Sequence, residues 1–358
     1  MRCALKGVTV FVLILLTTLM LITPLALAQA TIKVPDPEGD DKGPGLCGYP
    51  TGGGVFVEGV FDLTKFEISV EDNYIVFKVH FKNLGGNPWG GPNGWSLQYV
   101  GIFVRTSTPM VFERSDTFGL GFTLRPDYSW HYAVILAPGW GEPGAPVPAG
   151  EKCALYFANG SVLMQTEELF ACKGLPDDNL IEASIKKDLL SDVENIVKWK
   201  IVVAVTSYDG FGPARIRPLI AASTGEWQIP ATAYAKPEDI SRISLAILKG
   251  VAPRVMDLIV YSPEYPNGIT ADQQYTWLNS FDVEIPMPAQ VPAILVVPQT
   301  ITLTVTQTYT TIYTTISIST FVTTTTTTVR EIDWTTTIAL VVVMLVVGVA
   351  IGYIIKRK

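Results

Sequence analysis

The chain has 358 residues, of which 48% are hydrophobic, with 26 lysines and arginines against 33 aspartates and glutamates. Without the two basic residues of the first 30 positions and the three at the C-terminal end, 21 basic residues face 33 acidic ones, a net charge of −12. A surface this acidic argues against nucleic acid and anionic membrane surfaces as partners, and it is compatible with cations and with neutral ligands such as glycans.

Residues 1–30 have the pattern of a secretory signal peptide. Arg2 and Lys6 precede the apolar run Val8–Leu27, and small residues around Ala28 offer cleavage sites. Because the apolar run is long for a signal peptide, an uncleaved anchor is the alternative. Pro24, just before the alanine-rich end, favours cleavage.

Acidic residues gather among glycines and prolines directly after this leader, in the sequence DPEGDDKGPG that begins at residue 36. The prolines exclude a helix here. Clustered carboxylates suit calcium, which takes six to eight oxygen ligands in adaptable geometry. The alternative is a series of Asx turns, in which the aspartates bond neighbouring backbone N–H groups. The predicted calcium ligands are Asp36, Asp40 and Asp41, with Asp62 and Asp257 added from their places at strand edges.

Short segments of alternating apolar and polar residues, separated by turn residues, predict an all-β fold, an antiparallel β-sandwich. Residues 66–70 and 74–82 form a hairpin whose second strand directs Ile75, Phe77 and Val79 inward. The other expected strands are residues 97–106, 130–136, 154–157, 162–165, 180–185, 199–207 and 255–261. Two short helices are expected over residues 237–249 and 271–278.

Three cysteines remain outside the leader. Cys153 and Cys172 bracket one hairpin-like segment, and we expect them to form a disulfide, which persists outside the cell. Cys47 is then buried or linked elsewhere. Asn159 belongs to the one N-glycosylation sequon of the sequence and lies at a predicted hairpin tip.

The C-terminal part predicts a stalk and a membrane anchor. Residues 299–329 are rich in threonine and carry no charge, which is typical of an extended and often O-glycosylated spacer, with edge-to-edge β aggregation as the alternative. Residues 335–355 form an uncharged run of about 20 residues, long enough to span a bilayer as a helix. The basic residues 356–358 place the C-terminus in the cytoplasm, and a core helix is the alternative to the single span.

Catalytic patterns are missing from the sequence, which contains no G-x-S-x-G, H-E-x-x-H or phosphate-binding motif. His80 is expected on the solvent face of a strand, and His131, between two aromatic residues, is expected to be structural. Adjacent acids such as Glu167 and Glu168 are usually only solvated. We therefore expect a protein that is not an enzyme.

Tryptophans are candidates for ligand binding, because sugar faces stack on aromatic rings. The glycine- and proline-rich setting of Trp89 and Trp95 favours a loop that exposes a ring. The alternative is that these rings pack in the core. The candidate residues are Trp89, Trp95, Trp130, Trp140 and Trp227.

Four blocks of sequence carry a resemblance to a known family: DPEGDDKGPG with YPT and FDL, NPWGGPNGWSLQ, SYDGFG with RP and EW, and DQ with SFD. In this order they resemble the C-terminal, SLH-like binding module of glucodextranase, which also occurs in archaeal amylopullulanase-type surface proteins. The resemblance implies a β-sandwich related to DOMON-like and family 9 carbohydrate-binding domains. Cys47 and Gln228–Pro230 depart from the family pattern, which puts the fine structure of that edge in doubt.

The sequence thus predicts a single-pass cell-surface protein with an extracellular domain that binds an α-glucan or an envelope glycan. A structural envelope component that binds another surface protein is the alternative. A haem-binding DOMON-type domain is a further one, and it would need an axial histidine or methionine in a pocket.

Overall fold

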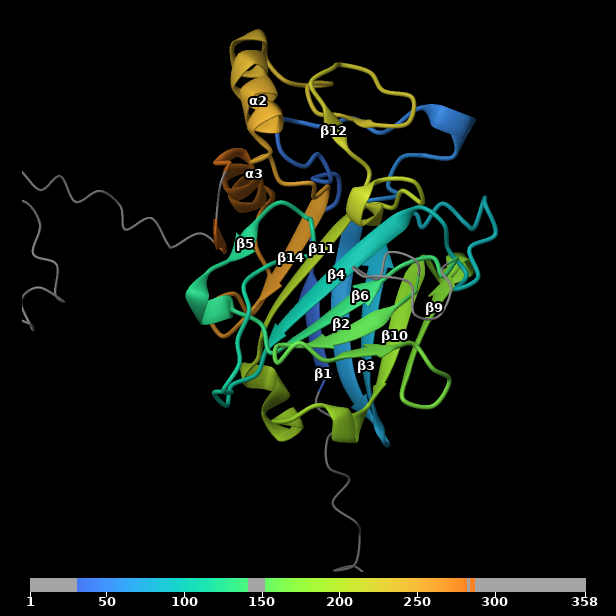
Figure 1. Ribbon diagram of the computed structural model, residues 1–358, viewed down its shortest axis with the longest axis vertical. Helices are drawn as coiled ribbons and strands as arrows, with labels where there is room; N and C mark the ends of the chain where they lie inside the picture. Colours follow the sequence, from blue (N-terminus) through green and yellow to red (C-terminus); the bar gives the residue numbers. More distant parts are fainter. Residues whose placement is uncertain (1–30, 141–151, 282–283, 287–358) are drawn as a thin grey trace, which may run out of the picture. The chain divides into compact units, whose positions relative to one another are not determined.

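Two antiparallel sheets organise the part of the chain that the computed structural model describes, residues 31–140, 152–281 and 284–286 (Figure 1). The first sheet has the strand order β1-β2-β3-β10-β9. Its strands are β1 (Thr31–Pro35), β2 (Leu63–Glu71), β3 (Tyr74–Phe81), β10 (Leu180–Lys186) and β9 (Phe170–Leu175).

The second sheet has the order β14-β11-β4-β6-β7-β8. Its strands are β14 (Asp257–Tyr261), β11 (Lys200–Ser207), β4 (Gln98–Arg105), β6 (Tyr132–Leu136), β7 (Ala154–Phe157) and β8 (Val162–Met164). Two short parallel pairs add β12 (Leu219–Ile220) to β13 (Ile229–Pro230) and β15 (Glu284–Ile285) to β5 (Thr123–Leu124).

The core between the two sheets comes from the alternation of the strands. Phe66, Phe77 and Ile181 of the first sheet join Ile102 and Val203 of the second in one buried cluster. The packing of inward-facing residues from two antiparallel sheets confirms the predicted sandwich-like all-β fold. The β2–β3 hairpin is also confirmed, with a register that pairs Glu71 with Tyr74.

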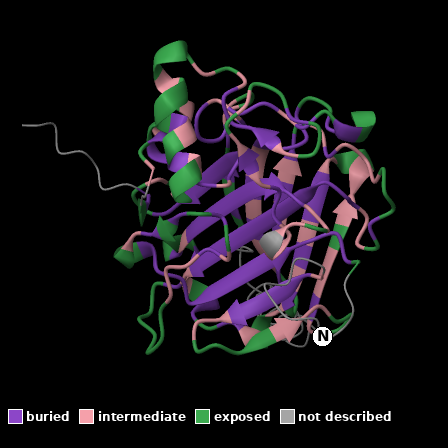
Figure 2. Cartoon of the chain, turned by 45° about the horizontal axis from the view of Figure 1, so that its top comes forward, coloured by how far each residue is buried: buried purple, intermediate pink, exposed green. Residues whose placement is uncertain are grey.

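The outer face of the second sheet is buried too. Tyr99, Phe103 and Val202 point away from the first sheet and pack with residues of the covering segments, among them Phe122 and Trp277. Central strands are consequently buried along most of their length (Figure 2). A sheet covered on both faces explains why β4, β11 and β14 are almost continuously apolar instead of alternating.

The two predicted helices are confirmed as α2 (Pro237–Lys249) and α3 (Ala271–Asn279). Helix α2 begins with proline and ends at Gly250, whose φ of 73° is the left-handed conformation that terminates helices. Helix α3 begins with a capping box between Thr270 and Gln273. Short 3-10 turns complete the described elements: η1 (Gly52–Gly54), η2 (Pro126–Tyr128), η3 (Pro176–Asp178), η4 (Lys187–Leu189), η5 (Val193–Lys198) and η6 (Pro213–Arg215).

The cysteines link the two sheets. Cys153, just before β7, forms a disulfide with Cys172 of β9. The two cysteines bracket the β7–β8 hairpin, as the sequence suggested, and the bond also joins one sheet to the other. Cys47 is buried as a free thiol that donates to the carbonyl oxygen of Pro44.

Asn159 lies exposed in the β7–β8 turn and accepts hydrogen bonds from the N–H and hydroxyl of Ser161.

The leader, the threonine-rich segment, the expected span and the tail, residues 1–30, 299–329, 335–355 and 356–358, lie outside the described residues. Among the residues that are described, no helix has the length and apolar character needed to cross a membrane.

Candidate functional site

An aromatic pocket lies where two of the sequence blocks meet. The loop that carries Trp89 and the loop that follows β11 form its walls, and its volume is about 750 Å³. Ten residues line it: Trp89, Trp140, Tyr208, Asp209, Gly210, Phe211, Arg217, Pro218, Trp227 and Gln228.

The loop before β4 holds Trp89 in place through the side chain of Asn87. The Asn87 amide accepts from the N–H of Gly91 at 2.7 Å and donates to the carbonyl oxygen of the same residue at 2.9 Å. The Ser96 hydroxyl donates to Asn87 and accepts from the N–H of Trp89 at 3.2 Å. These bonds close the loop on itself. Trp89 stays 38% exposed, and its ring forms a T-shaped pair with the ring of Phe56.

Trp227 is held from behind by the N-terminal loop. The N–H groups of Thr51 and Gly52 donate to the carbonyl oxygens of Gly225 and Glu226 at 2.9 and 2.6 Å. A Cβ on Gly52 would lie 2.7 Å from the Trp227 ring, so glycine lets the indole rest on the backbone. The Trp227 ring centroid lies 6.4 Å from that of Trp89, and both rings face the same pocket.

Arg217 supports the pocket floor. Its buried guanidinium donates to the Ser207 hydroxyl at 2.9 Å and to the carbonyl oxygens of Trp227 and Tyr208 at 2.7 and 2.9 Å. Burial lowers the pKa of Arg217, and the carboxylate of Asp209 opposes that change. Because its guanidinium bonds to other groups of the protein, Arg217 holds the backbone of the aromatic residues Tyr208 and Trp227 in place. Asp209 and Gln228 supply further polar groups in the lining.

The structure sorts the five candidate tryptophans into two groups. Trp89, Trp140 and Trp227 line the pocket and are 38%, 40% and 42% exposed. Trp95 and Trp130 are fully buried, and their indole N–H groups donate to the carbonyl oxygens of Gln98 and Asp116. With no ring face open to solvent, these two are core residues and have no place in a ligand site.

Several lining residues were absent from the sequence-based candidates. Tyr208, whose ring lies 5.5 Å from that of Trp140, and Phe211, whose side chain is fully exposed, are the most prominent. Both belong to the SYDGFG block. The signal that could have identified them is an aromatic pair in a glycine-rich turn.

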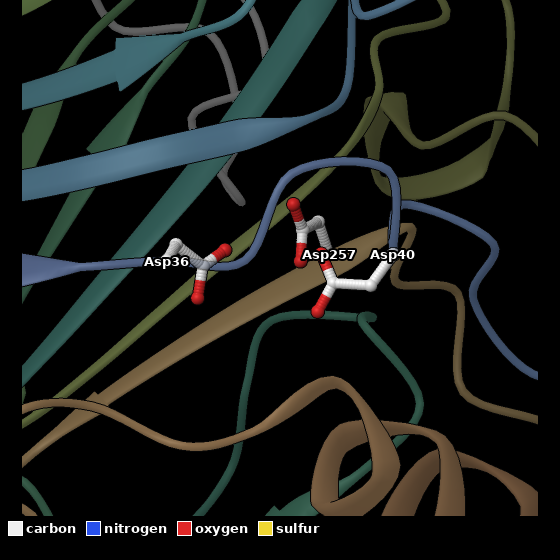
Figure 3. Close-up of side chains that lie close together, drawn as sticks. All are labelled: Asp36, Asp40 and Asp257. Atoms are coloured by element: carbon white, nitrogen blue, oxygen red, sulfur yellow. The ribbon is translucent and has the colours of Figure 1, made fainter.

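An acidic cluster forms a second candidate site. Asp36 directly after β1, Asp40 in the following loop and Asp257 at the start of β14 bring one carboxylate oxygen each within 4.8 Å of one another (Figure 3). Asp36 is 9% exposed and Asp257 is fully buried. Carboxylate oxygens from three parts of the chain thus meet in a place shielded from water.

Burial and mutual repulsion disfavour the charged forms of these carboxyls. Burial and the negative charge of Asp257 raise the pKa of Asp36 to about 11. Burial, opposed by its own backbone N–H, raises the pKa of Asp40 to about 7. Burial and the charge of Asp40 raise the pKa of Asp257 well above its ordinary value.

The two other predicted metal ligands have different partners. Asp41 forms an ion pair with Lys42 at 3.3 Å. Asp62 forms one with Lys82 at 3.7 Å and accepts the N–H of Gly39 with both oxygens, at 3.0 and 2.9 Å. Asp62 therefore fixes the loop from 23 positions away, which differs from the local bond of an Asx turn. No N–H or hydroxyl group of another described residue donates to Asp36 or Asp40.

The two histidines lie apart from both sites. His80 on β3 is 3.4 Å from Glu67 of the neighbouring strand. His131 is fully buried, with its Nδ1 2.7 Å from the Thr106 hydroxyl and its Nε2 3.5 Å from Glu113. Neither ring lines the aromatic pocket.

Comparison with known proteins agrees with the fold and with the order of the sequence blocks. The model of one family, described as the C-terminal binding module, SLH-like, of glucodextranase, matches residues 31–298. None of the curated proteins matches the chain. The family is that of a binding module and not of a catalytic domain. The match spans well over half of the chain, which therefore belongs to the family of the SLH-like C-terminal binding module of glucodextranase.

Proposed function

We propose that this chain is a non-catalytic, membrane-anchored cell-surface protein that binds carbohydrate, an α-glucan or an envelope glycan, in the aromatic pocket. The observation that carries the proposal is the convergence of Trp89, Trp140 and Trp227 on one pocket in a chain that belongs to a binding-module family.

The chemistry of the pocket suits a neutral sugar. Pyranose rings have apolar C–H faces that stack on aromatic rings, and hydroxyl groups that bond nearby polar side chains such as Asp209 and Gln228. A volume of about 750 Å³ falls within the range of small-molecule sites. The guanidinium of Arg217 already bonds to groups of the protein, and the net charge of the chain is negative. Both features favour a neutral ligand over an anionic one.

Display at the cell surface is supported by the ends of the sequence and by the disulfide. The leader-like residues 1–30 and the uncharged residues 335–355 fit export and anchoring. The Cys153–Cys172 disulfide fits an oxidising compartment. In this proposal residues 299–329 act as a stalk between the binding domain and the membrane.

The test is titration of the purified full-length protein with soluble gluco-oligosaccharides, followed by tryptophan fluorescence and calorimetry. We expect Trp89→Ala and Trp227→Ala each to weaken binding roughly 10-fold, the loss of about 1.4 kcal/mol that one stacking ring supplies. Phe112→Ala is the matched control, because Phe112 is an exposed aromatic residue outside the pocket and should leave the affinity unchanged.

Saturable binding that is lost in the pocket variants and kept in the control would support the proposal. Absence of binding to every oligosaccharide tested would contradict it. That result would instead favour the alternative of a surface-protein partner, for which the fully exposed Phe211 of the pocket lining offers a contact.

A further inference from the structure

If its carboxyls are ionised, the acidic cluster holds more negative charge than the surrounding residues neutralise. Asp36, Asp40 and Asp257 face one another with little access to water. Ionised carboxylates in such a place need a compensating positive charge or must take up protons. The nearby lysines have other partners, since Lys42 pairs with Asp41 and Lys82 with Asp62. Among the described residues, no ion pair reaches the three clustered carboxylates.

Protons alone do not satisfy the cluster. All four carboxylate oxygens of Asp36 and Asp40 are buried and accept no hydrogen bond from another described residue. A proton shared between Asp36 and Asp257 would occupy one oxygen of each and leave the oxygens of Asp40 without a donor. Buried acceptors without donors are rare in native proteins and ask for a specific explanation.

An independent buried acceptor lies against the same cluster. Gln274 of α3 is 2% exposed, and its Oε1 has no hydrogen-bond partner among the described residues. The Nε2 of the same amide donates to the backbone carbonyl oxygen of Asp40 at 2.9 Å. The same side chain lies close enough to Asp257 to lower the pKa of that carboxyl, against the effect of burial. The Gln274 amide therefore contacts the loop that carries Asp40, and its oxygen is buried without a hydrogen-bond donor.

The surrounding structure holds these groups in place. The N–H groups of Leu63 and Leu258 each donate to one oxygen of Asp257 at 2.7 Å, which fixes the orientation of that carboxylate. The loop that carries Asp40 is bound at both sides, because the N–H of Gly39 donates to Asp62 and the N–H of Gly43 donates to the carbonyl oxygen of Met256.

We infer that Asp36, Asp40, Asp257 and the Oε1 of Gln274 form a calcium site. The donors are all oxygens, with no histidine or thiol among them, which disfavours zinc. They come from a strand end, a loop, a second strand and a helix, an irregular arrangement that Ca²⁺ accepts more readily than the octahedral Mg²⁺. The ion would tie the end of β1 to β14 and α3. This inference is independent of the proposed glycan binding.

The test is calorimetric titration of the full-length protein with CaCl₂ after treatment with a chelator, and then with MgCl₂. One calcium ion per chain, bound more tightly than magnesium, is the expected result. Asp36→Asn and Asp40→Asn should each weaken calcium binding at least about 100-fold, and Gln274→Leu about 10-fold.

Asp41→Asn is the matched control, because it makes the same charge change in the same loop at a residue paired with Lys42. It should change the calcium affinity less than about 3-fold, unlike a direct ligand. Equal weakening by Asp41→Asn and Asp36→Asn would overturn the assignment, since a general loss of negative charge would then explain both. Absence of saturable binding by the wild-type protein at millimolar calcium would overturn the assignment as well. This second test needs no variant, so it applies even if the asparagine variants fail to fold.

Discussion

At Gly52, the absence of a side chain allows the ring of Trp227 to take its place in the pocket lining. Its backbone lies directly behind the Trp227 indole, and its N–H donates to the carbonyl oxygen of Glu226. Any larger residue at this position has to move the ring or the loop. The conformation of the pocket wall therefore depends on a residue that does not line the pocket.

Gly52→Ala tests this dependence. The new methyl group would lie 2.6 Å from the Glu226 carbonyl oxygen and 2.7 Å from the Trp227 ring. We expect a loss of about 1–3 kcal/mol in unfolding free energy, and weaker oligosaccharide binding because Trp227 is displaced. Denaturant unfolding and the glucan titration measure the two effects. Gly54→Ala is the control: its Cβ meets no atom within 4 Å, so only the strain of its φ of 63° applies.

Residue types alone did not separate the tryptophans that line the pocket from those in the core. Trp89 and Trp95 share one glycine- and proline-rich loop, yet one ring is 38% exposed and the other is fully buried. The difference comes from the Asn87 and Ser96 hydrogen bonds that fold the loop, and no spacing rule reports them. The same holds for the acidic residues, because residue type did not separate the clustered aspartates from the others. Asp41 and Asp62 pair with lysines and do not belong to the cluster.

Among the helices and strands, those with the clearest sequence pattern were predicted correctly. The β2–β3 hairpin follows from alternation on both sides of the turn residues 71–73, and helix α2 follows from an apolar face between a proline and a glycine. Both are confirmed, as is the second short helix, α3. Strand β9 was not predicted, because its sequence FACKGL contains a glycine and a lysine and lacks a clear alternation. The two-residue parallel pairs have too few residues to leave a pattern, and they exist because tertiary contacts align them.

The disulfide is the covalent link between elements of different sheets. Cys153 and Cys172 are 19 residues apart, and a cross-link of this loop size restricts the unfolded chain by about 3 kcal/mol. We therefore expect Cys153→Ser combined with Cys172→Ser to lower the unfolding free energy by roughly that amount, measured by denaturant unfolding. The oxidised and reduced wild-type proteins should differ to the same extent, whereas the double variant should not respond to reductant.

At the scale of the whole molecule, the proposal of anchoring makes a prediction about partitioning. The full-length protein should pellet with membranes and resist extraction by high salt or alkaline buffer, because the uncharged, largely apolar segment 335–355 would lie in the hydrocarbon core. A chain ending at residue 330 should be released in soluble form. Extraction of the full-length protein by salt alone would contradict the anchor and indicate attachment through the folded domain.

The β15–β5 pair has a mechanical consequence if the domain is tethered through its C-terminal side. Tension from a bound surface polymer would then leave the domain through β15, which pairs with β5 over two residues and receives one further bond from the N–H of Arg125 to the carbonyl oxygen of Ile285. Because this pair is so short, β15 would separate from β5 at a lower force than the strands of either sheet would separate from one another. Neither β15 nor β5 contributes to the pocket lining or the acidic cluster. The tether would therefore lengthen under load while the proposed binding site kept its structure.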